Sequence, residues 1–518
     1  MRLPEIIKRH PLGWSGLVLG VALILGAALR LSGADFCLPM EHCHPDEHWL
    51  LNPALKMLHT GDFNPHFFIY PTLFIYVLLA VFSLTFIVGV SAGLWGGVGS
   101  IKTAPFLLAG RLAAGLLGSL TLVGVYAAAK RLLDRESAAV AALALAVMPL
   151  HVSNSHFIVT DVPAGFFCTL ALLAALRVAG EGSARHYRYA GLLAGFAAAA
   201  KYNAALVGIN VLIAHWANPR REGYFSPNLV RGILWCVLGF FIASPYSFFE
   251  LTRFLDGMAH EIAHYRSGHI GHQGDYNRLF YLVFLGSRGF GPVLTALGLY
   301  GAYSMVRRFR REYLLVLVFP VLYILFLGGY KVRFVRNLMP VLPYLAIWIG
   351  CGAVALFRDV RASWPRVGRI AGWKLATPGL LMALAIPGSI TLSESYDLAR
   401  DDTRVTARQW VIDNIPPGST IYYQSWSVDA LPPGQFTRSR DRWNWDYYIG
   451  TDRLSRKYFA MKGWAREKYD EVVEAYQHQP LMVFQGRKDN PFYYTANPTV
   501  YIMKRDPTRE RIKAPRAR

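Results

Sequence analysis

Charged residues are scarce in this sequence. They make up 17% of its 518 residues, whereas 53% are hydrophobic and 14% are aromatic. Soluble globular chains carry about 25% charged residues, so this composition excludes an ordinary soluble protein. It indicates a polytopic membrane protein instead.

Acidic residues are scarcer than basic ones, with 33 Asp and Glu against 54 Lys and Arg, a formal net charge of +21. The sequence shows no basic groove interleaved with stacking aromatics, so nucleic acid is excluded as a partner. The basic residues form short clusters between apolar runs, and the positive-inside rule places such clusters in the cytoplasm. The clusters are Arg2, Lys8 and Arg9; Lys130, Arg131 and Arg135; Arg185 and Arg188; Arg220 and Arg221; Arg307, Arg308, Arg310 and Arg311; and Arg358, Arg361, Arg366 and Arg369.

The apolar runs between these clusters predict about 11 transmembrane helices. The run 70–95 is long enough to cross, but a single crossing there would reverse the side of every later cluster. We therefore predict that it lies along the outer surface, re-enters from that surface, or pairs with 96–103. The predicted spans are 13–32, 104–129, 137–153, 163–180, 189–201, 203–217, 230–249, 279–306, 312–329, 338–357 and 370–392.

Cysteine is rare as well, with five in the chain. Cys168, Cys236 and Cys351 lie in apolar spans, where a thiol behaves as a small hydrophobic group. Cys37 and Cys43 share the first predicted outer loop. In an oxidising compartment a disulfide between them could close this loop, and two free thiols are the alternative.

Acids and histidines concentrate in this first outer loop, at 42–49. Pro45 suits the first turn of a helix, so Asp46 and Glu47 would lie at a helix N-terminus, where the dipole favours negative charge. Such a carboxylate beside lipid could take a proton from a hydroxyl or amine nucleophile. The alternative is that the two acids only cap an interfacial helix.

The same stretch could hold a divalent metal cation through His44, Asp46 and His48. However, the spacing of these residues matches no familiar zinc signature. The sequence therefore leaves two alternatives open: no cofactor, or a divalent metal cation at these residues.

Other unusual polar residues fall in the later loops predicted to lie outside the cytoplasm. Asp161 either caps the next helix or acts as a second acid. Lys201 follows a run of alanines, where a lysine either binds an anion or extends to the surface. Lys331, Arg333 and Arg336 oppose the positive-inside rule, which indicates a phosphate or, alternatively, lipid headgroups as their partner.

The sequence after residue 392 changes character. An amphipathic pattern at 406–415, ended by prolines, predicts a helix, and 420–423 predicts a strand. We therefore divide the chain into a transmembrane module, 1–392, and a small extracytoplasmic α/β domain, 393–518, with a basic tail. No tandem repeat is visible.

The order of several motifs over residues 10–350 resembles the polytopic GT-C glycosyltransferases that use a polyprenyl-phosphate sugar, which include protein O-mannosyltransferases and the lipid A aminoarabinose transferase. The matching residues are His44-Pro45-Asp46-Glu47, Gly61-Asp62-Phe63-Asn64-Pro65, Tyr70-Pro71-Thr72-Leu73, Arg111, Pro149 with Asp161-Val162-Pro163, Lys201-Tyr202 and Arg336-Asn337-Leu338-Met339-Pro340.

The resemblance implies an all-α membrane fold with surface-lying helices in the first outer loop. It implies an inverting sugar transfer to a hydroxyl or amine of a lipid, glycan or protein, on the outer face of the cell (inner) membrane. Asp46 would be the base with Glu47 beside it, and Asp161 the second acid. The donor phosphate would be held by Lys201 and Arg336, with Arg333 and Lys331 as further candidates, and the pocket would include His44, Tyr70, His156, Tyr202 and His264.

Two other functions fit part of the pattern. A transporter would place such residues near the membrane midplane and show repeats, whereas here they lie at span ends without a repeat. An outer-face ligase or polymerase of lipid-linked oligosaccharides would use similar chemistry with a diphosphate donor. The sequence does not identify the sugar, the acceptor or the oligomeric state.

Overall fold

The computed structural model describes residues 13–269, 272, 274, 277–363, 372–424, 426–429, 431–440, 443–452, 475, 480–486, 497–506 and 508. The chain forms two compact units. The first contains Met1–Leu31, Trp49–Ile101 and Ala109–Glu394, and the second contains Ser32–His48, Lys102–Leu108 and Ser395–Arg518. The second unit thus joins the C-terminal segment to the start of the first predicted outer loop and to residues 102–108, at the start of the next predicted span.

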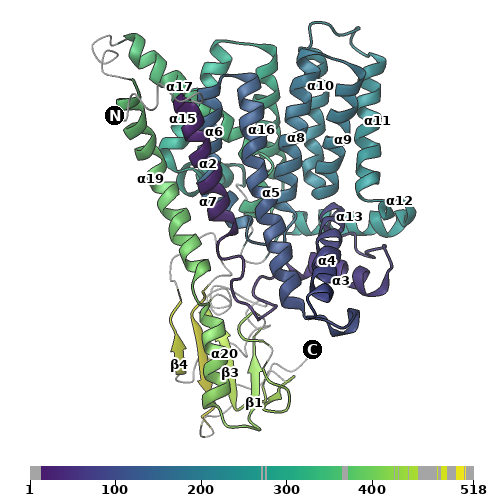
Figure 1. The fold of residues 1–518 in the computed structure, drawn as a ribbon, viewed down its shortest axis with the longest axis vertical. Coiled ribbons are helices and arrows are strands. Elements are labelled where there is room, and N and C mark those ends of the chain that lie inside the picture. The colour runs from purple at the N-terminus through teal and green to yellow at the C-terminus, as the bar shows by residue number, and fades with distance from the viewer. Residues whose placement is uncertain are drawn as a thin grey trace. The chain divides into compact units, whose positions relative to one another are not determined.

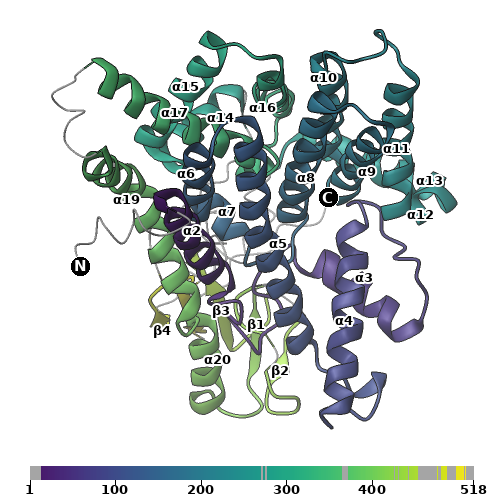
Figure 2. The ribbon, with the colours of Figure 1, turned by 45° about the horizontal axis from the view of Figure 1, so that its top comes forward.

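The first unit is helical, as predicted. In Figures 1 and 2, α8, α9, α10 and α11 stand side by side, and α4 lies at one end of this group rather than among its helices. The helices are α2 (Gly13–Leu31), α3 (His48–Thr60), α4 (Leu73–Ser91), α5 (Thr103–Leu132), α6 (Arg135–Ala146), α7 (Pro149–Asn154), α8 (Asp161–Gly180), α9 (Ala184–Ala200), α10 (Ile209–Ala217), α11 (Pro227–Ala243), α12 (Tyr246–Phe249), α13 (Leu251–Ser267), α14 (Asn277–Phe284), α15 (Gly291–Arg307), α16 (Leu314–Leu327), α17 (Leu342–Ser363) and α19 (Gly372–Ala399).

Within the described part of the chain, the helices α2, α4, α5 and α8 are long and apolar enough to cross a membrane. The predicted span 279–306 is bent, because Asn277–Gly289 and Gly291–Arg307 meet at 117°. Gly291 takes a φ of +74°, which favours glycine, and Pro292 then starts a new helix. The total of about 11 crossings and the surface position of 70–95 stay predictions.

Small residues let the helices of the first unit approach closely. A Cβ added at Gly191 of α9 would lie 2.0 Å from the carbonyl oxygen of Gly232 on α11, and one at Gly195 would lie 2.3 Å from that of Cys236. Such contacts between backbones are typical of helix packing in membranes. They hold α9 against α11 and so fix the end of α9 at Ala200, next to Lys201.

The second unit contains the predicted α/β domain. Its strands form a sheet in the order β2-β1-β3-β5-β4, and α20 (Thr403–Asn414) contributes Ala407 and Val411 to an apolar core with Ile421, Ile449 and Ile502. β1 pairs in parallel with β2 and β3, and β5 pairs antiparallel with β3 and β4. The strands are β1 (Thr420–Tyr423), β2 (Thr437–Arg438), β3 (Tyr447–Thr451), β4 (Pro480–Phe484) and β5 (Val500–Lys504).

A buried ion pair connects α20 to the first-loop segment inside this second unit. Arg404 binds Asp402 through Nη2 to Oδ2 at 2.7 Å and Nε to Oδ1 at 2.8 Å, and its Nη1 donates to the carbonyl of Cys43 at 2.9 Å. Cys43 forms a disulfide with Cys37, which confirms one of the two predicted alternatives. Burial acts to raise the pKa of Asp402, but Arg404 and backbone hydrogen bonds hold this pKa below its ordinary value.

We expect Asp402→Asn to lower the free energy of unfolding of the second unit by about 3 kcal/mol, because it leaves the Arg404 cation buried without its carboxylate. A depressed native pKa stabilises the fold above the unfolded-state pKa, and this contribution is lost as the pH falls through the native pKa. The wild-type contribution should therefore be complete above the ordinary value of 3.8 and decline below it. Denaturant unfolding at several pH values measures both effects. Asp401→Asn, at the exposed neighbouring position, is the control, and an equal loss in both variants would contradict this explanation.

Candidate active site

Asp161, Lys201 and Arg336 come together in the first unit from three separate elements. Asp161 is the first residue of α8, Lys201 follows the end of α9, and Arg336 lies in the 3-10 helix η5 (Val335–Leu338). Lys201 Nζ lies 2.5 Å from Asp161 Oδ1, and Arg336 Nε lies 3.9 Å from Asp161 Oδ2. We call these three residues the cation site, after the two cationic side chains of Lys201 and Arg336.

The cation site has a graded exposure. The side chain of Asp161 is 4% exposed and that of Lys201 is 13% exposed, whereas that of Arg336 is 28% exposed. One carboxylate lies beside two cations within this group, and Glu261, on α13, also acts on Lys201 electrostatically. A buried charge needs a partner and further hydrogen bonds, and Arg336 is the most accessible of the three side chains. The cation site can therefore receive an anion.

Asn337 and Tyr265 complete the cation site. Lys201 Nζ donates to Asn337 Oδ1 at 2.8 Å, and the hydroxyl of Tyr265, on α13, donates to the same oxygen at 3.1 Å. The Asn337 Nδ2 group faces Tyr281 but is buried without a hydrogen bond of normal geometry among the described residues. Sequence reasoning did not select Asn337 or Tyr265, although Asn337 directly follows Arg336 in the matched motif.

Arg333 and Lys331, also predicted to bind phosphate, are directed elsewhere. Arg333 Nε donates to Asn277 Oδ1 at 2.6 Å, and its guanidinium lies 5.2 Å from the ring centre of Phe280, on α14. Lys331 is exposed, and its backbone N–H donates to the carbonyl of Tyr265 at 3.2 Å. The structure thus brings Arg336 alone of this basic group to Asp161.

Two predicted pocket residues lie near the cation site. The Tyr202 hydroxyl donates to the carbonyl of Phe68 at 2.8 Å, which holds part of the first outer loop at the end of α9. The ring of His264 lies 6.3 Å from that of Phe334, and the Arg336 guanidinium lies 4.6 Å from the same Phe334 ring.

The other two pocket residues in this unit have local contacts. His156 is fully buried, with Nδ1 2.9 Å from the carbonyl oxygen of Val152. Tyr70 packs the edge of its ring against Phe67 at 5.8 Å. These contacts stabilise the chain locally.

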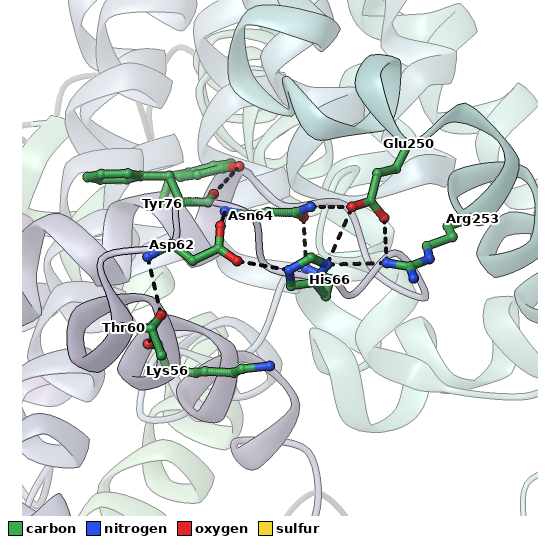
Figure 3. A network of polar contacts seen from close by, with 9 residues as sticks. Lys56, Thr60, Asp62, Asn64, His66, Tyr76, Glu250 and Arg253 are labelled. Carbon is green, nitrogen blue, oxygen red and sulfur yellow. Dashed lines mark hydrogen bonds and ion pairs between the residues drawn. The ribbon is translucent and has the colours of Figure 1, made fainter.

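The Gly61–Pro65 motif forms a second polar network in the first unit (Figure 3). His66 Nε2 lies 2.9 Å from Asp62 Oδ2, and His66 Nδ1 lies 3.4 Å from Glu250 Oε1. Asn64 also donates to Glu250, and Arg253 Nη1 donates to the other Glu250 oxygen at 2.9 Å. This network fixes the loop to the start of α13, and the sequence did not reveal Glu250 or Arg253 as its partners.

Asp46 lies in the second unit, in the turn before α3, whereas the Pro45 pattern predicted the first turn of the helix itself. Its backbone N–H donates to His44 Nδ1 at 3.1 Å, and the neighbouring Glu47 is buried, whereas Asp46 is partly exposed. Asp429 holds the same loop through His42 Nδ1 at 3.0 Å and through backbone N–H groups, and this hydrogen bond raises the pKa of His42. Asp429 was not identified from the sequence.

His44, Asp46 and His48 do not form a ready metal site. Among the residues that the structure describes, no group of three or more His, Cys, Asp or Glu side chains is arranged to hold a metal ion. The Nδ1 of His44 is occupied by the Asp46 backbone, which turns this ring toward its own loop. The predicted cation therefore has no ligand set within the described residues.

Comparison with known proteins supports the predicted fold. A family model described as dolichyl-phosphate-mannose-protein mannosyltransferase matches residues 106–248. None of the curated proteins matches the chain.

Three solved structures give the likeness over most of the chain. The archaeal oligosaccharyltransferase AglB from Archaeoglobus fulgidus, in complex with an inhibitory peptide and a dolichol-phosphate, is 12% identical, with 88% of this chain and 72% of that chain covered and a TM-score of 0.54. ArnT from Cupriavidus metallidurans in the apo state is 16% identical, with 94% of this chain and 97% of that chain covered and a TM-score of 0.54. ArnT bound to undecaprenyl phosphate is 15% identical, with 95% of this chain and 98% of that chain covered and a TM-score of 0.52. These likenesses confirm the predicted GT-C fold. The apolar helices α2, α4, α5 and α8 indicate a membrane protein.

A double-mutant cycle should show that Asp161 and Lys201 stabilise each other. We expect Asp161→Asn and Lys201→Met each to lower the free energy of unfolding by about 3 kcal/mol, because each leaves a charge buried. The double variant should cost less than the sum by at least about 1 kcal/mol. Denaturant unfolding of the purified protein in detergent measures this coupling.

The control cycle uses Arg131→Met and Glu181→Gln. This pair is 2.8 Å apart, but its side chains are 37% and 54% exposed, so no coupling is expected. Additive losses for Asp161 and Lys201 would show that they do not act as a pair.

Proposed function

We propose that this chain, which has the GT-C fold, is an integral-membrane glycosyltransferase that transfers a sugar from a polyprenyl-phosphate donor to an acceptor hydroxyl or amine. The observation that carries the proposal is the cation site, where Lys201 and Arg336 share the single carboxylate of Asp161. Two cationic side chains around one carboxylate, one of them accessible, suit a phosphate group. In this proposal Asp161 is a positioning residue that fixes the two cations.

The reaction is a single displacement. The acceptor oxygen or nitrogen forms a bond to the anomeric carbon, the bond from that carbon to the donor phosphate oxygen breaks, and the configuration inverts. The Asp46 carboxylate takes the acceptor proton, and the leaving phosphate keeps the bonding electron pair. Lys201 and Arg336 stabilise the negative charge that develops on this phosphate.

The class of donor is supported by what the similar structures contain. AglB is described with a dolichol-phosphate, and ArnT with undecaprenyl phosphate. Both are lipid monophosphates of the kind that the cation site would bind. The acceptor is left open between a lipid, a glycan and a protein.

The side of the membrane is supported by the disulfide. Cys37 and Cys43 are paired in the loop that contains Asp46, and disulfides persist in oxidising compartments outside the cytoplasm. We therefore place the reaction on the outer face of the cell membrane, the face that the positive-inside rule gives for this loop.

One assay distinguishes the proposed function from its rivals. Purified protein in detergent is given a polyprenyl-monophosphate sugar, or the same sugar on a polyprenyl diphosphate, and sugar transfer is followed. Transfer from the monophosphate alone supports the proposal, whereas transfer from the diphosphate alone would indicate an oligosaccharide ligase or polymerase. Uptake into liposomes without transfer would indicate a transporter.

We expect Asp46→Asn to reduce turnover by at least about 100-fold, because the amide cannot accept the acceptor proton. Binding of the donor should be unchanged, since the cation site is intact. Turnover and donor binding are measured separately on the same purified protein. The control is Asp35→Asn, an exposed acid of the same loop, and full activity of Asp46→Asn would refute the assignment of the base.

Arg336→Gln should weaken donor binding by about tenfold, because one charge-assisted hydrogen bond to the phosphate is lost. Titration of the protein with the lipid phosphate measures this affinity. The control variant is Arg266→Gln, on the exposed side of α13. If Arg266→Gln weakened binding as much, general electrostatic attraction rather than the cation site would account for it.

A further inference from the structure

A cavity of about 130 Å³ lies in the first unit, far along the bundle from the cation site. It is formed where the α5–α6 turn, the end of α15 and the last turns of α17 meet. α17 is 22 residues long, about 30 Å, and it begins shortly after η5 and ends at this cavity. We call it the arginine cavity, because its lining includes Arg308, Arg310 and Arg358, together with Asp134, Ser137 and Tyr313.

The charge of the arginine cavity is positive. The three segments that form it, 133–137, 304–313 and 351–361, carry seven arginines and four acids, including the acids that pair with the lining arginines. The cavity therefore attracts anions, and the planar guanidinium groups can bind the oxygens of a phosphate in pairs.

The three arginines are held by contacts that can be exchanged. Arg358 reaches Asp134 at 3.0 Å and Glu136 at 2.8 Å, Arg308 reaches Asp359 at 3.2 Å, and Arg310 reaches Glu312 at 3.6 Å. The arginine side chains are between 48% and 57% exposed. Ion pairs at such exposed positions contribute little to stability. A phosphate can therefore join or replace these carboxylates without a large loss.

The size of the arginine cavity limits what it can hold. Pockets that enclose a whole small-molecule ligand measure about 300–1,000 Å³. A cavity of about 130 Å³ accepts only a small group, so the rest of a larger ligand must lie outside it.

The surface beside the arginine cavity is apolar. Tyr303, Val306 and Phe309, at the end of α15, are exposed, and so are Leu356 and Val360 on α17. In a membrane protein such side chains contact acyl chains. A ligand that fits both features combines a small anionic group with hydrocarbon.

We propose that the arginine cavity binds the phosphate headgroup of an anionic phospholipid. Its acyl chains lie along the apolar side chains of α15 and α17. Basic pockets between helices on the cytoplasmic side are suited to such lipids, and this end of the bundle carries the basic clusters that the positive-inside rule assigns to the cytoplasm. Free phosphate would use the same arginines but not the apolar surface.

The test measures lipid retention and thermal stability of the full-length protein after removal of lipid in detergent. Phosphatidylglycerol, phosphatidylcholine or inorganic phosphate is added back, bound lipid is counted by native mass spectrometry, and Tm is recorded. We expect phosphatidylglycerol to be retained and to raise Tm. Arg308→Gln combined with Arg310→Gln should reduce its retention about tenfold.

The matched control combines Arg135→Gln with Arg311→Gln, which removes the same charge from exposed arginines outside the cavity lining. This control should retain the lipid as the wild type does. If the test variant does not fold, Arg308→Lys keeps the charge but loses the paired donors, and it should also reduce retention.

Three results would overturn the proposal. Equal retention in the test and control variants would show that the arginine cavity is not the site. Equal retention of phosphatidylcholine would indicate unspecific lipid contact. A Tm increase of the same size with inorganic phosphate would show that the site takes a free anion rather than a lipid.

Discussion

The first unit is organised by the need to pair charge in an apolar bundle. Asp161 and Lys201 are both largely buried, and their opposite charges compensate each other there. Their contact brings the start of α8 to the end of α9, and the hydrogen bond from Lys201 to Asn337 connects both helix ends to η5. These contacts join three helix ends, and Arg336 is the most accessible side chain of the group.

The same constraint explains Arg30, which the sequence analysis passed over inside the first apolar span. Arg30 is fully buried at the end of α2, and its guanidinium donates to the carbonyls of Leu145 and Ala146 and lies 2.9 Å from His151 Nδ1. These carbonyls are at the end of α6, where the helix has no further partners for them. Arg30 thus stabilises the break between α6 and α7, and this break directs the chain toward Asp161.

The prediction from sequence succeeded for features that a single segment of the chain determines. The lengths of the apolar runs predicted α2, α5 and α8, and the cost of a lysine among alanines selected Lys201. It failed for contacts between residues far apart in the sequence. These contacts are Tyr265 with Asn337, Glu250 with His66 and Asp429 with His42. Composition gives no sign of such pairs, because each partner alone resembles an ordinary polar residue of a loop. The break near Gly291 was missed for a different reason, since hydrophobicity does not register a change in backbone direction.

The C-terminal domain holds the loop that contains Asp46. The proposed base, Asp46, lies in a segment that is far from this domain in sequence but belongs to the same compact unit. The segment is closed by its own disulfide and held by Arg404 at the carbonyl of Cys43 and by Asp429 at His42. Both anchoring residues belong to the α/β domain, so the domain fixes the conformation of the loop that contains the proposed base. In the proposed reaction, its sheet and core would act by keeping that loop ordered, without contact with the sugar.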